Sequence, residues 1–436
     1  MWVRPIAAVV GPAAVIAAGT MGTGSTASLV LAGAWFRYDL LWIVVITLPA
    51  LVVSMDSSSR VGVLSGGKGM LSLIREHVHP SVSWAILAVL SLTYFFIVMG
   101  QMSVMTSAFL SIFGYYRPTG AEGAGTYQTL EVIVSWLLAG AILALLLSGG
   151  YDRAQRVITA LLIVMFVCFL IVAVRGFQEV GEIVKGLIPK IPDDLSVPGG
   201  GVRDPITSIV AIAGGTLSPL AILGVCYLSV ENRSRPGDVG RDFKQAVLNL
   251  AVIFGMYSVF VLVAGGFALY PLDNHAAIFE VHEAGQVLTR SLPVSLAAVG
   301  PRIFAVGFFF AGLTSLVVIV QLMVYLCLDA FDQDWRYTID NMRFRRLLTV
   351  WVVIPSLLAP FWSFPALLKI ILLMGLNIVV VPVAILIVIY LVNKQSLMGA
   401  YRANVWRNIV LWGSMALSLW LAGSRLPGHV DALLGR

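Results

Sequence analysis

Two short segments combine glycine with hydroxyl side chains inside otherwise apolar runs. The first is Gly22-Thr23-Gly24-Ser25, and the second is Gly214-Gly215-Thr216, followed by Ser218 and Pro219. If each segment interrupts a helix, the half-helix N-termini expose backbone N–H groups that suit a carboxylate or another anion. The predicted chemistry is therefore reversible binding of a small solute between two facing breaks. The alternative is that the glycines only allow helices to pack closely.

Three polar residues in other apolar runs are candidates for further contacts with this solute: Gln101, Thr314 and Ser315. The alternatives are that Gln101 makes an interhelical hydrogen bond and that the two hydroxyls bond back to their own helix. The apolar runs contain no pairing of a nucleophile with a base. We therefore expect no enzyme activity, no catalytic residue, no cofactor and no resident metal ion.

Charged residues near the ends of apolar runs have simpler interpretations. Arg302 and Lys369 are expected to extend their charged groups toward the membrane surface. The segment DAFDQD, residues 329–334, lacks the glycine and the closing glutamate of a calcium loop, so we expect a solvated loop there.

The composition is that of an integral membrane protein. Of 436 residues, 59% are hydrophobic and only 11% are charged, about half the charge of a soluble domain. A bilayer requires about 20 apolar residues per helix, and the uncharged runs predict eleven membrane-spanning helices. They cover residues 5–36, 40–55, 81–116, 132–151, 157–174, 205–230, 245–272, 304–328, 347–368, 370–393 and 408–424. The net charge of +6 then reflects basic loops at the membrane, and no nucleic-acid partner is expected.

A Pro/Gly-rich polar loop divides these helices into five and six. We expect a first five-helix repeat over residues 1–174, an extracellular loop over 175–204, a second, inverted repeat over 205–393, and an eleventh helix with a tail over 394–436. Breaks at matching positions in two such halves are typical of inverted-repeat transporters with a site near the midplane. The distribution of Lys and Arg places the N-terminus in the cytoplasm and the C-terminus outside, in a prokaryotic plasma membrane. A monomer is compatible with the sequence, which leaves the oligomeric state open.

Several motifs make the chain similar to the Nramp (natural resistance-associated macrophage protein) family of proton-coupled divalent-metal transporters. They are Gly11-Pro12, Ala32-Gly33-Ala34, Leu40-Leu41-Trp42, the run from Ser58 to Gly66, and Leu397-Met398-Gly399. The resemblance implies an all-α, LeuT-like five-plus-five inverted repeat with one extra helix. It also implies secondary active transport by alternating access, with helices 1 and 6 broken at the midplane.

The expected metal ligands of that family are replaced in this chain. The family's Asp-Pro-Gly-Asn break falls on Gly22-Thr23-Gly24-Ser25, and its Met-Pro-His break falls on Ser218-Pro219-Leu220. A second family histidine falls on Val225, and the acidic pair of span 3 falls within residues 99–104, which contain no acid. We therefore expect a small organic anion or zwitterion as the substrate. The alternative is a divalent cation, Mg²⁺ or Mn²⁺, partly hydrated and with weak or no proton coupling.

Overall fold

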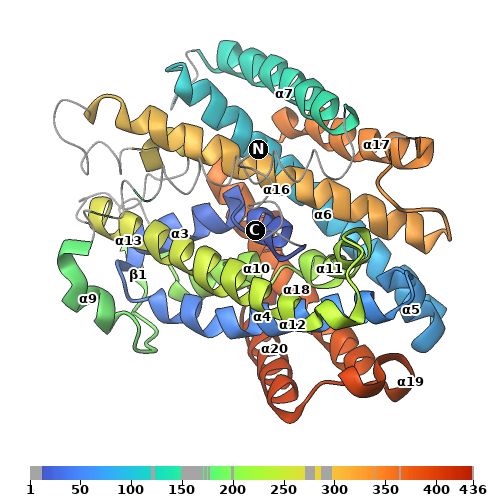
Figure 1. Ribbon diagram of the computed structural model, residues 1–436. Coiled ribbons are helices and arrows are strands. Elements are labelled where there is room, and N and C mark those ends of the chain that lie inside the picture. The colour runs from blue at the N-terminus through green and yellow to red at the C-terminus, as the bar shows by residue number, and fades with distance from the viewer. Residues whose placement is uncertain are drawn as a thin grey trace, which may run out of the picture.

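The computed structural model describes residues 12–118, 123–148, 170, 174, 177–197, 201–270, 280–285, 297–338, 340–362 and 365–434 (Figure 1). Helices dominate this part of the chain, and one antiparallel hairpin pairs Leu195 with Arg203 and Val197 with Gly201. The first half contains α2 (Pro12–Thr20), α3 (Thr23–Phe36), α4 (Leu41–Leu64), α5 (Met70–His77), α6 (Pro80–Ile112), α7 (Ala124–Leu147), η1 (Phe177–Glu179), α9 (Val180–Lys185), β1 (Leu195–Val197) and β2 (Gly201–Arg203). The second half contains α10 (Pro205–Thr216), α11 (Pro219–Glu231), η2 (Pro236–Asp238), α12 (Val239–Ala246), the π-helix η3 (Val247–Phe254), α13 (Gly255–Ala268), α16 (Gly300–Ala330), α17 (Met342–Leu358), η4 (Ala359–Phe361), α18 (Ala366–Asn393), α19 (Gln395–Met398), η5 (Gly399–Tyr401) and α20 (Val405–Leu434).

The described residues contain eight helical spans long and apolar enough to cross a bilayer, or nine when the bent pair α2–α3 is counted as one span. The predicted count of eleven is therefore reached only in part. The predicted span 157–174 lies outside the described residues except for residues 170 and 174. The predicted span 408–424 lies within α20, which does not pass the same test of length and hydropathy.

The first glycine-rich segment separates two helices. Helix α2 ends at Thr20 and α3 begins at Thr23, and their axes are bent by 50°. Gly22 is the extended N-cap of α3 (φ −72°, ψ 176°), so the chain leaves helical geometry for two residues only. The second segment also separates two helices, since α10 ends at Thr216 and α11 begins at Pro219. Pro219 has no N–H to continue the hydrogen bonding of α10, and its ring favours the first turn of a new helix.

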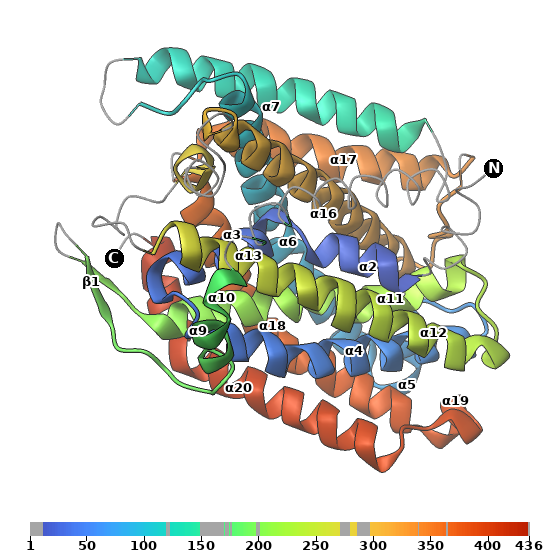
Figure 2. The same cartoon turned by 60° about the vertical axis from the view of Figure 1, so that its left-hand side comes forward.

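Long helices surround these two breaks. Helix α16 packs along α6, and α18 packs against α10, α6 and α3, while α13 packs along α3. Helices α7 and α17 lie together on one side of the molecule, and α20 lies on the opposite side (Figure 2). Backbones approach closely where glycines meet: a Cβ on Gly33 would lie 2.3 Å from the Leu262 oxygen, and one on Gly265 would lie 2.3 Å from the Val30 oxygen. Small residues thus bring α3 against α13.

Candidate substrate site at the helix breaks

A buried cavity of about 30 Å³ lies where the two breaks meet. Five elements contribute polar groups to it: the α2–α3 break, the α10–α11 break, α6, α16 and α18. Its walls are formed by Ile16, Gly19, Thr20, Gly22, Gly24, Ser25, Tyr94, Gln101, Gly215, Ser218, Leu220, Ala221, Ser315, Val318, Ile319, Leu322, Met374 and Asn377. Sequence analysis predicted seven of these residues: Gly22, Gly24, Ser25, Gln101, Gly215, Ser218 and Ser315.

Gln101 connects three helices beside this cavity. The Thr23 hydroxyl donates a hydrogen bond to Gln101 Oε1, and Gln101 Nε2 donates to Ser315 Oγ at 3.0 Å. Gln101 is 1% exposed, and its partners come from α3 and α16. The side chain therefore makes the interhelical hydrogen bonds that the simpler interpretation predicted, and it also lines the cavity.

The N-terminus of α11 already has hydrogen-bond acceptors from the protein. Leu220 N donates to the Tyr94 hydroxyl at 3.3 Å, and Ala221 N donates to Ser218 Oγ at 3.4 Å. The hydroxyls of Tyr94 and Ser218 are themselves 2.7 Å apart. Because Pro219 has no N–H, little donor capacity remains at this helix end for an anion.

Oxygen acceptors gather at the opposite side of the same break. The Ser25 hydroxyl donates to the Gly215 carbonyl at 3.3 Å, and Asn377 Nδ2 donates to the Gly214 carbonyl at 3.4 Å. The remaining amide oxygen, Asn377 Oδ1, is buried and has no hydrogen-bond partner among the described residues. Carbonyl groups at the C-terminal end of a helix carry partial negative charge, so this corner favours a cation.

The glycines at the breaks also have a packing role. A Cβ on Gly22 would lie 2.3 Å from Ser315 Oγ, and one on Gly24 would lie 2.6 Å from Met374 Sδ. Helices α16 and α18 thus approach the break because no side chain stands there. The sequence predicted that an anion would bind beside Gly22, but Ser315 occupies that space.

Four predicted site residues do not line the cavity: Thr23, Gly214, Thr216 and Thr314. Thr23 and Gly214 act through their hydrogen bonds to Gln101 and Asn377. Thr314 donates to the carbonyl of Ala311 on its own helix at 3.0 Å. This is the bond within the helix that the sequence analysis gave as the alternative to substrate binding. Thr216 is a buried residue at the end of α10.

Sequence analysis missed Tyr94, Met374 and Asn377. Asn377 is the single amide side chain in the apolar stretch 370–392, and that isolation was a usable signal. The family's methionine position in the α10–α11 break is Ser218, but Met374 of α18 places a thioether in the cavity wall. Among the described residues, no group of three or more His, Cys, Asp or Glu side chains could hold a metal ion.

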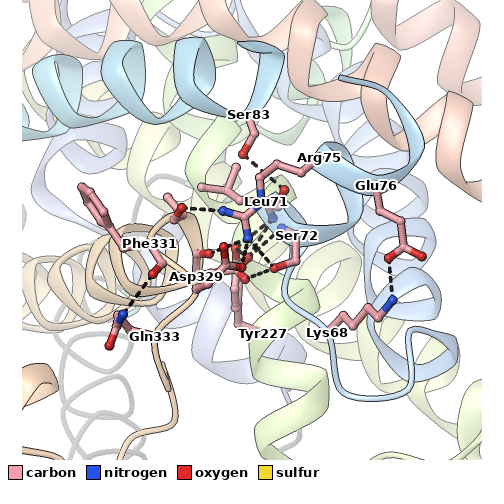
Figure 3. Close-up of polar contacts among 12 residues, drawn as sticks. Lys68, Leu71, Ser72, Arg75, Glu76, Ser83, Tyr227, Asp329, Phe331 and Gln333 are labelled. Carbon is pink, nitrogen blue, oxygen red and sulfur yellow. Dashed lines mark hydrogen bonds and ion pairs between the residues drawn. The ribbon is translucent and has the colours of Figure 1, made fainter. Parts of the chain in front are cut away.

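A second polar constellation joins α5, α11 and α16 around the buried carboxylate of Asp329 (Figure 3). Asp329 Oδ2 accepts from Leu71 N at 2.9 Å, Ser72 N at 3.1 Å and the Tyr227 hydroxyl at 2.6 Å. Its Oδ1 accepts from Ser72 Oγ at 2.5 Å. Asp329 therefore caps the N-terminus of α5 from another helix. The predicted solvated loop is wrong at this residue, since Asp329 lies in the last turn of α16 and is 3% exposed.

Comparisons with known proteins agree with this architecture. The family model described as "Natural resistance-associated macrophage protein-like" matches residues 13–426. The chain belongs to the Nramp family. The MntH divalent metal cation transporter of Xanthomonas campestris pv. campestris is 24% identical, with 100% of this chain and 92% of that protein covered. The MntH divalent metal cation transporter of Klebsiella pneumoniae (strain 342) is 25% identical, covering 97% and 94% of the two chains.

Solved structures share the fold. A mutant of the Eremococcus coleocola manganese transporter superposes with a TM-score of 0.77 at 17% identity, covering 99% of this chain and 88% of that one. MhsT in complex with L-phenylalanine superposes with a TM-score of 0.60 at 15% identity, covering 94% and 96%. Together with the apolar helices, family membership makes this Nramp chain an integral membrane transporter and not an enzyme.

Proposed function

We propose that this Nramp chain is a secondary active transporter for a divalent cation, Mn²⁺ or Mg²⁺, that keeps part of its water shell. The cation is held between the two helix breaks and exchanges between the two sides by alternating access. The observation that carries this proposal is Asn377 Oδ1, which has no hydrogen-bond partner in the described part of the chain and belongs to a residue lining the cavity beside carbonyl groups of α10. Two relatives that match this chain almost from end to end are divalent metal cation transporters, which supports the same substrate class.

The expected organic anion or zwitterion is not supported. The cavity of about 30 Å³ has space for about two water molecules, since one needs about 10–15 Å³ by the same measure. The α11 N-terminus, which was expected to bind a carboxylate, donates instead to Tyr94 and Ser218. Both features suit an ion with one or two waters better than an organic solute.

Neutral ligands set the degree of hydration. Gln101 Oε1, Asn377 Oδ1, the hydroxyls of Ser25 and Ser315 and the Met374 thioether surround the cavity, and no lining residue is a carboxylate or an imidazole. A bare divalent ion without compensating charge is strongly disfavoured in a low-dielectric site. Retained water lowers that cost, and Mg²⁺ dehydrates reluctantly in any case.

The membrane topology that we propose is the one that the sequence predicts. Residues 1–174 form one repeat and residues 205–393 the inverted second, connected by the extracellular segment 175–204, with residues 394–436 added. The N-terminus lies in the cytoplasm of a bacterial cell and the C-terminus outside, in keeping with the basic loops. The two breaks then lie at corresponding positions near the bilayer midplane.

Flux into proteoliposomes tests the substrate class. We expect Mn²⁺ or Mg²⁺ to enter, measured with an enclosed metal-sensitive dye, and radiolabelled alanine to stay outside. Gln101→Leu, which removes a cavity oxygen, should lower metal influx, whereas Gln333→Leu, in the loop after α16 and outside the cavity lining, should not. Alanine influx without metal influx would overturn the proposal.

A further inference from the structure

Lys369 is a buried amine in α18 that the substrate site does not use. It is 2% exposed, so the expectation that it extends to the membrane surface is wrong. Its Nζ donates to Ser103 Oγ and to the Trp362 carbonyl, both at 2.9 Å, and lies 5.0 Å from the centroid of the Trp362 ring. No carboxylate of the described residues lies within 4.0 Å of it. A lysine that is buried without an ion pair gives up its proton more readily than a lysine in water.

Two hydroxyls of α6, one turn apart, contact this amine and a buried acid separately. Ser103 and Ser107 are four residues apart and lie on the same face of α6. Ser103 accepts from Lys369, and Ser107 donates to Glu280 Oε2 at 3.2 Å. Glu280 Oε1 also accepts from Ala366 N, at the start of the helix that carries Lys369, at 3.4 Å. Burial raises the pKa of Glu280, which lies outside the spans.

The charged groups that face Lys369 come from three other elements. They are Glu131 of α7, Glu280, and Arg117 after α6, which is 3.4 Å from Glu280. A cavity of about 130 Å³ lies beside them, lined by Arg117, Tyr127, Gln128 and Glu131 among others. This volume is large enough for several waters, which could carry a proton between Glu131 and the surroundings.

We propose that Lys369 is the site of the coupling proton in this transporter, in place of the weak or absent coupling that the sequence predicted, with Glu131 and Glu280 as its exchange partners. The inference rests on the proposed transport function. In the exchange, the ammonium of Lys369 gives one proton through water to a carboxylate, leaving a neutral amine and a carboxylic acid. The neutral amine can then accept a hydrogen bond from Ser103. The reverse transfer restores both charges, so no other reactant is needed.

The same helix connects the proton site to the substrate site. Met374 and Asn377, which line the central cavity, lie five and eight residues after Lys369 in α18. Eight helical residues span about 12 Å. A change in the hydrogen bonds of Lys369 therefore acts on a rigid element that also holds two cavity ligands. Lys369 is a positioning residue in this account, because it does not touch the cation.

Manganese influx into proteoliposomes under an imposed pH gradient tests this role, with a second dye that reports internal pH. In the wild type, we expect an inward proton gradient to raise Mn²⁺ influx several-fold, with acidification that depends on Mn²⁺. Lys369→Met should keep downhill Mn²⁺ influx but lose both the gradient effect and the acidification. Lys369→Arg, which stays charged, should lose them as well. Lys68→Met, at an exposed ion pair with Glu76, should behave as the wild type.

The two proposals fail in different ways. Wild-type influx that ignores the gradient, or a Lys369→Met variant that keeps full gradient dependence, overturns the proton site but leaves the cation transporter standing. Absence of metal influx from folded wild-type protein overturns the proposed function itself and the proton site with it. If Lys369→Met does not fold, Glu280→Gln replaces it, with the expectation of a shifted pH profile for influx.

Discussion

The central cavity and the Asp329 junction use polar groups in opposite ways. At the junction, both carboxylate oxygens of Asp329 have donors, from α5 and from Tyr227 of α11. At the cavity, the ligands are neutral, and Asn377 Oδ1 has no hydrogen-bond partner among the described residues. The charged carboxylate of Asp329 therefore lies where three helices are held together. The neutral, weaker ligands line the cavity where we propose that an ion enters and leaves, since a transported ion cannot be bound too tightly.

The largest expected effect comes from the junction. Asp329→Asn removes the charge that accepts from Leu71 N, Ser72 N and the Tyr227 hydroxyl. We expect a loss of about 3 kcal/mol or more in stability, because charged hydrogen bonds are lost in a buried site. Thermal unfolding in detergent, followed by tryptophan fluorescence, measures it.

Asp332 provides the matched control for this substitution. Its carboxylate forms an ion pair with Arg75 of α5, but its side chain is 79% exposed. Asp332→Asn should therefore change stability by about 1 kcal/mol at most. Equal losses in the two variants would contradict the view that the junction holds the fold.

The next effect concerns packing at the first break. Gly22→Ala places a Cβ 2.4 Å from the Ser315 Cβ, so α16 must move away from the cavity. We expect most Mn²⁺ influx to be lost. Adding Ser315→Gly removes the clash and should restore part of the influx. If the double variant stays as inactive as the single one, Gly22 has a role other than admitting α16.

A smaller effect is expected on metal selectivity. Met374→Leu conserves volume but removes the thioether beside Gly24. Since soft ligands favour transition metals over Mg²⁺, Mn²⁺ influx should fall a few-fold relative to Mg²⁺ influx. Met323→Leu, in the buried part of α16 away from the cavity lining, should leave the ratio unchanged. Equal ratios in both variants would exclude Met374 as a ligand.

The breaks in the sequence point to the candidate cavity, but the long-range contacts that complete its walls were not predicted. The two segments of glycine and hydroxyl residues, the proline that follows the second segment and the isolated Gln101 are all visible locally in the sequence. Seven of the predicted residues line the cavity. Met374 and Asn377 come from α18, which lies far away in sequence, and only packing brings them to the break. The buried states of Asp329 and Lys369 were missed for the same reason, since their partners Leu71 and Ser103 are over 250 positions distant.

The choice of substrate was the other point that local signals could not decide. Glycine N–H groups at a break look available in the sequence. In the structure, Tyr94 and Ser218 accept from the α11 N-terminus, and Ser315 fills the space beside Gly22. The acceptor oxygens left over, above all Asn377 Oδ1, favour a cation instead.

The most direct test is an anomalous-difference map from crystals of the protein soaked in Mn²⁺ at a concentration that supports influx into proteoliposomes. The account predicts a peak in the cavity between Gln101, Asn377 and Met374, and a weaker one in Asn377→Leu crystals. A strong peak elsewhere in the protein, or an empty cavity in crystals of a protein that transports Mn²⁺, would contradict it.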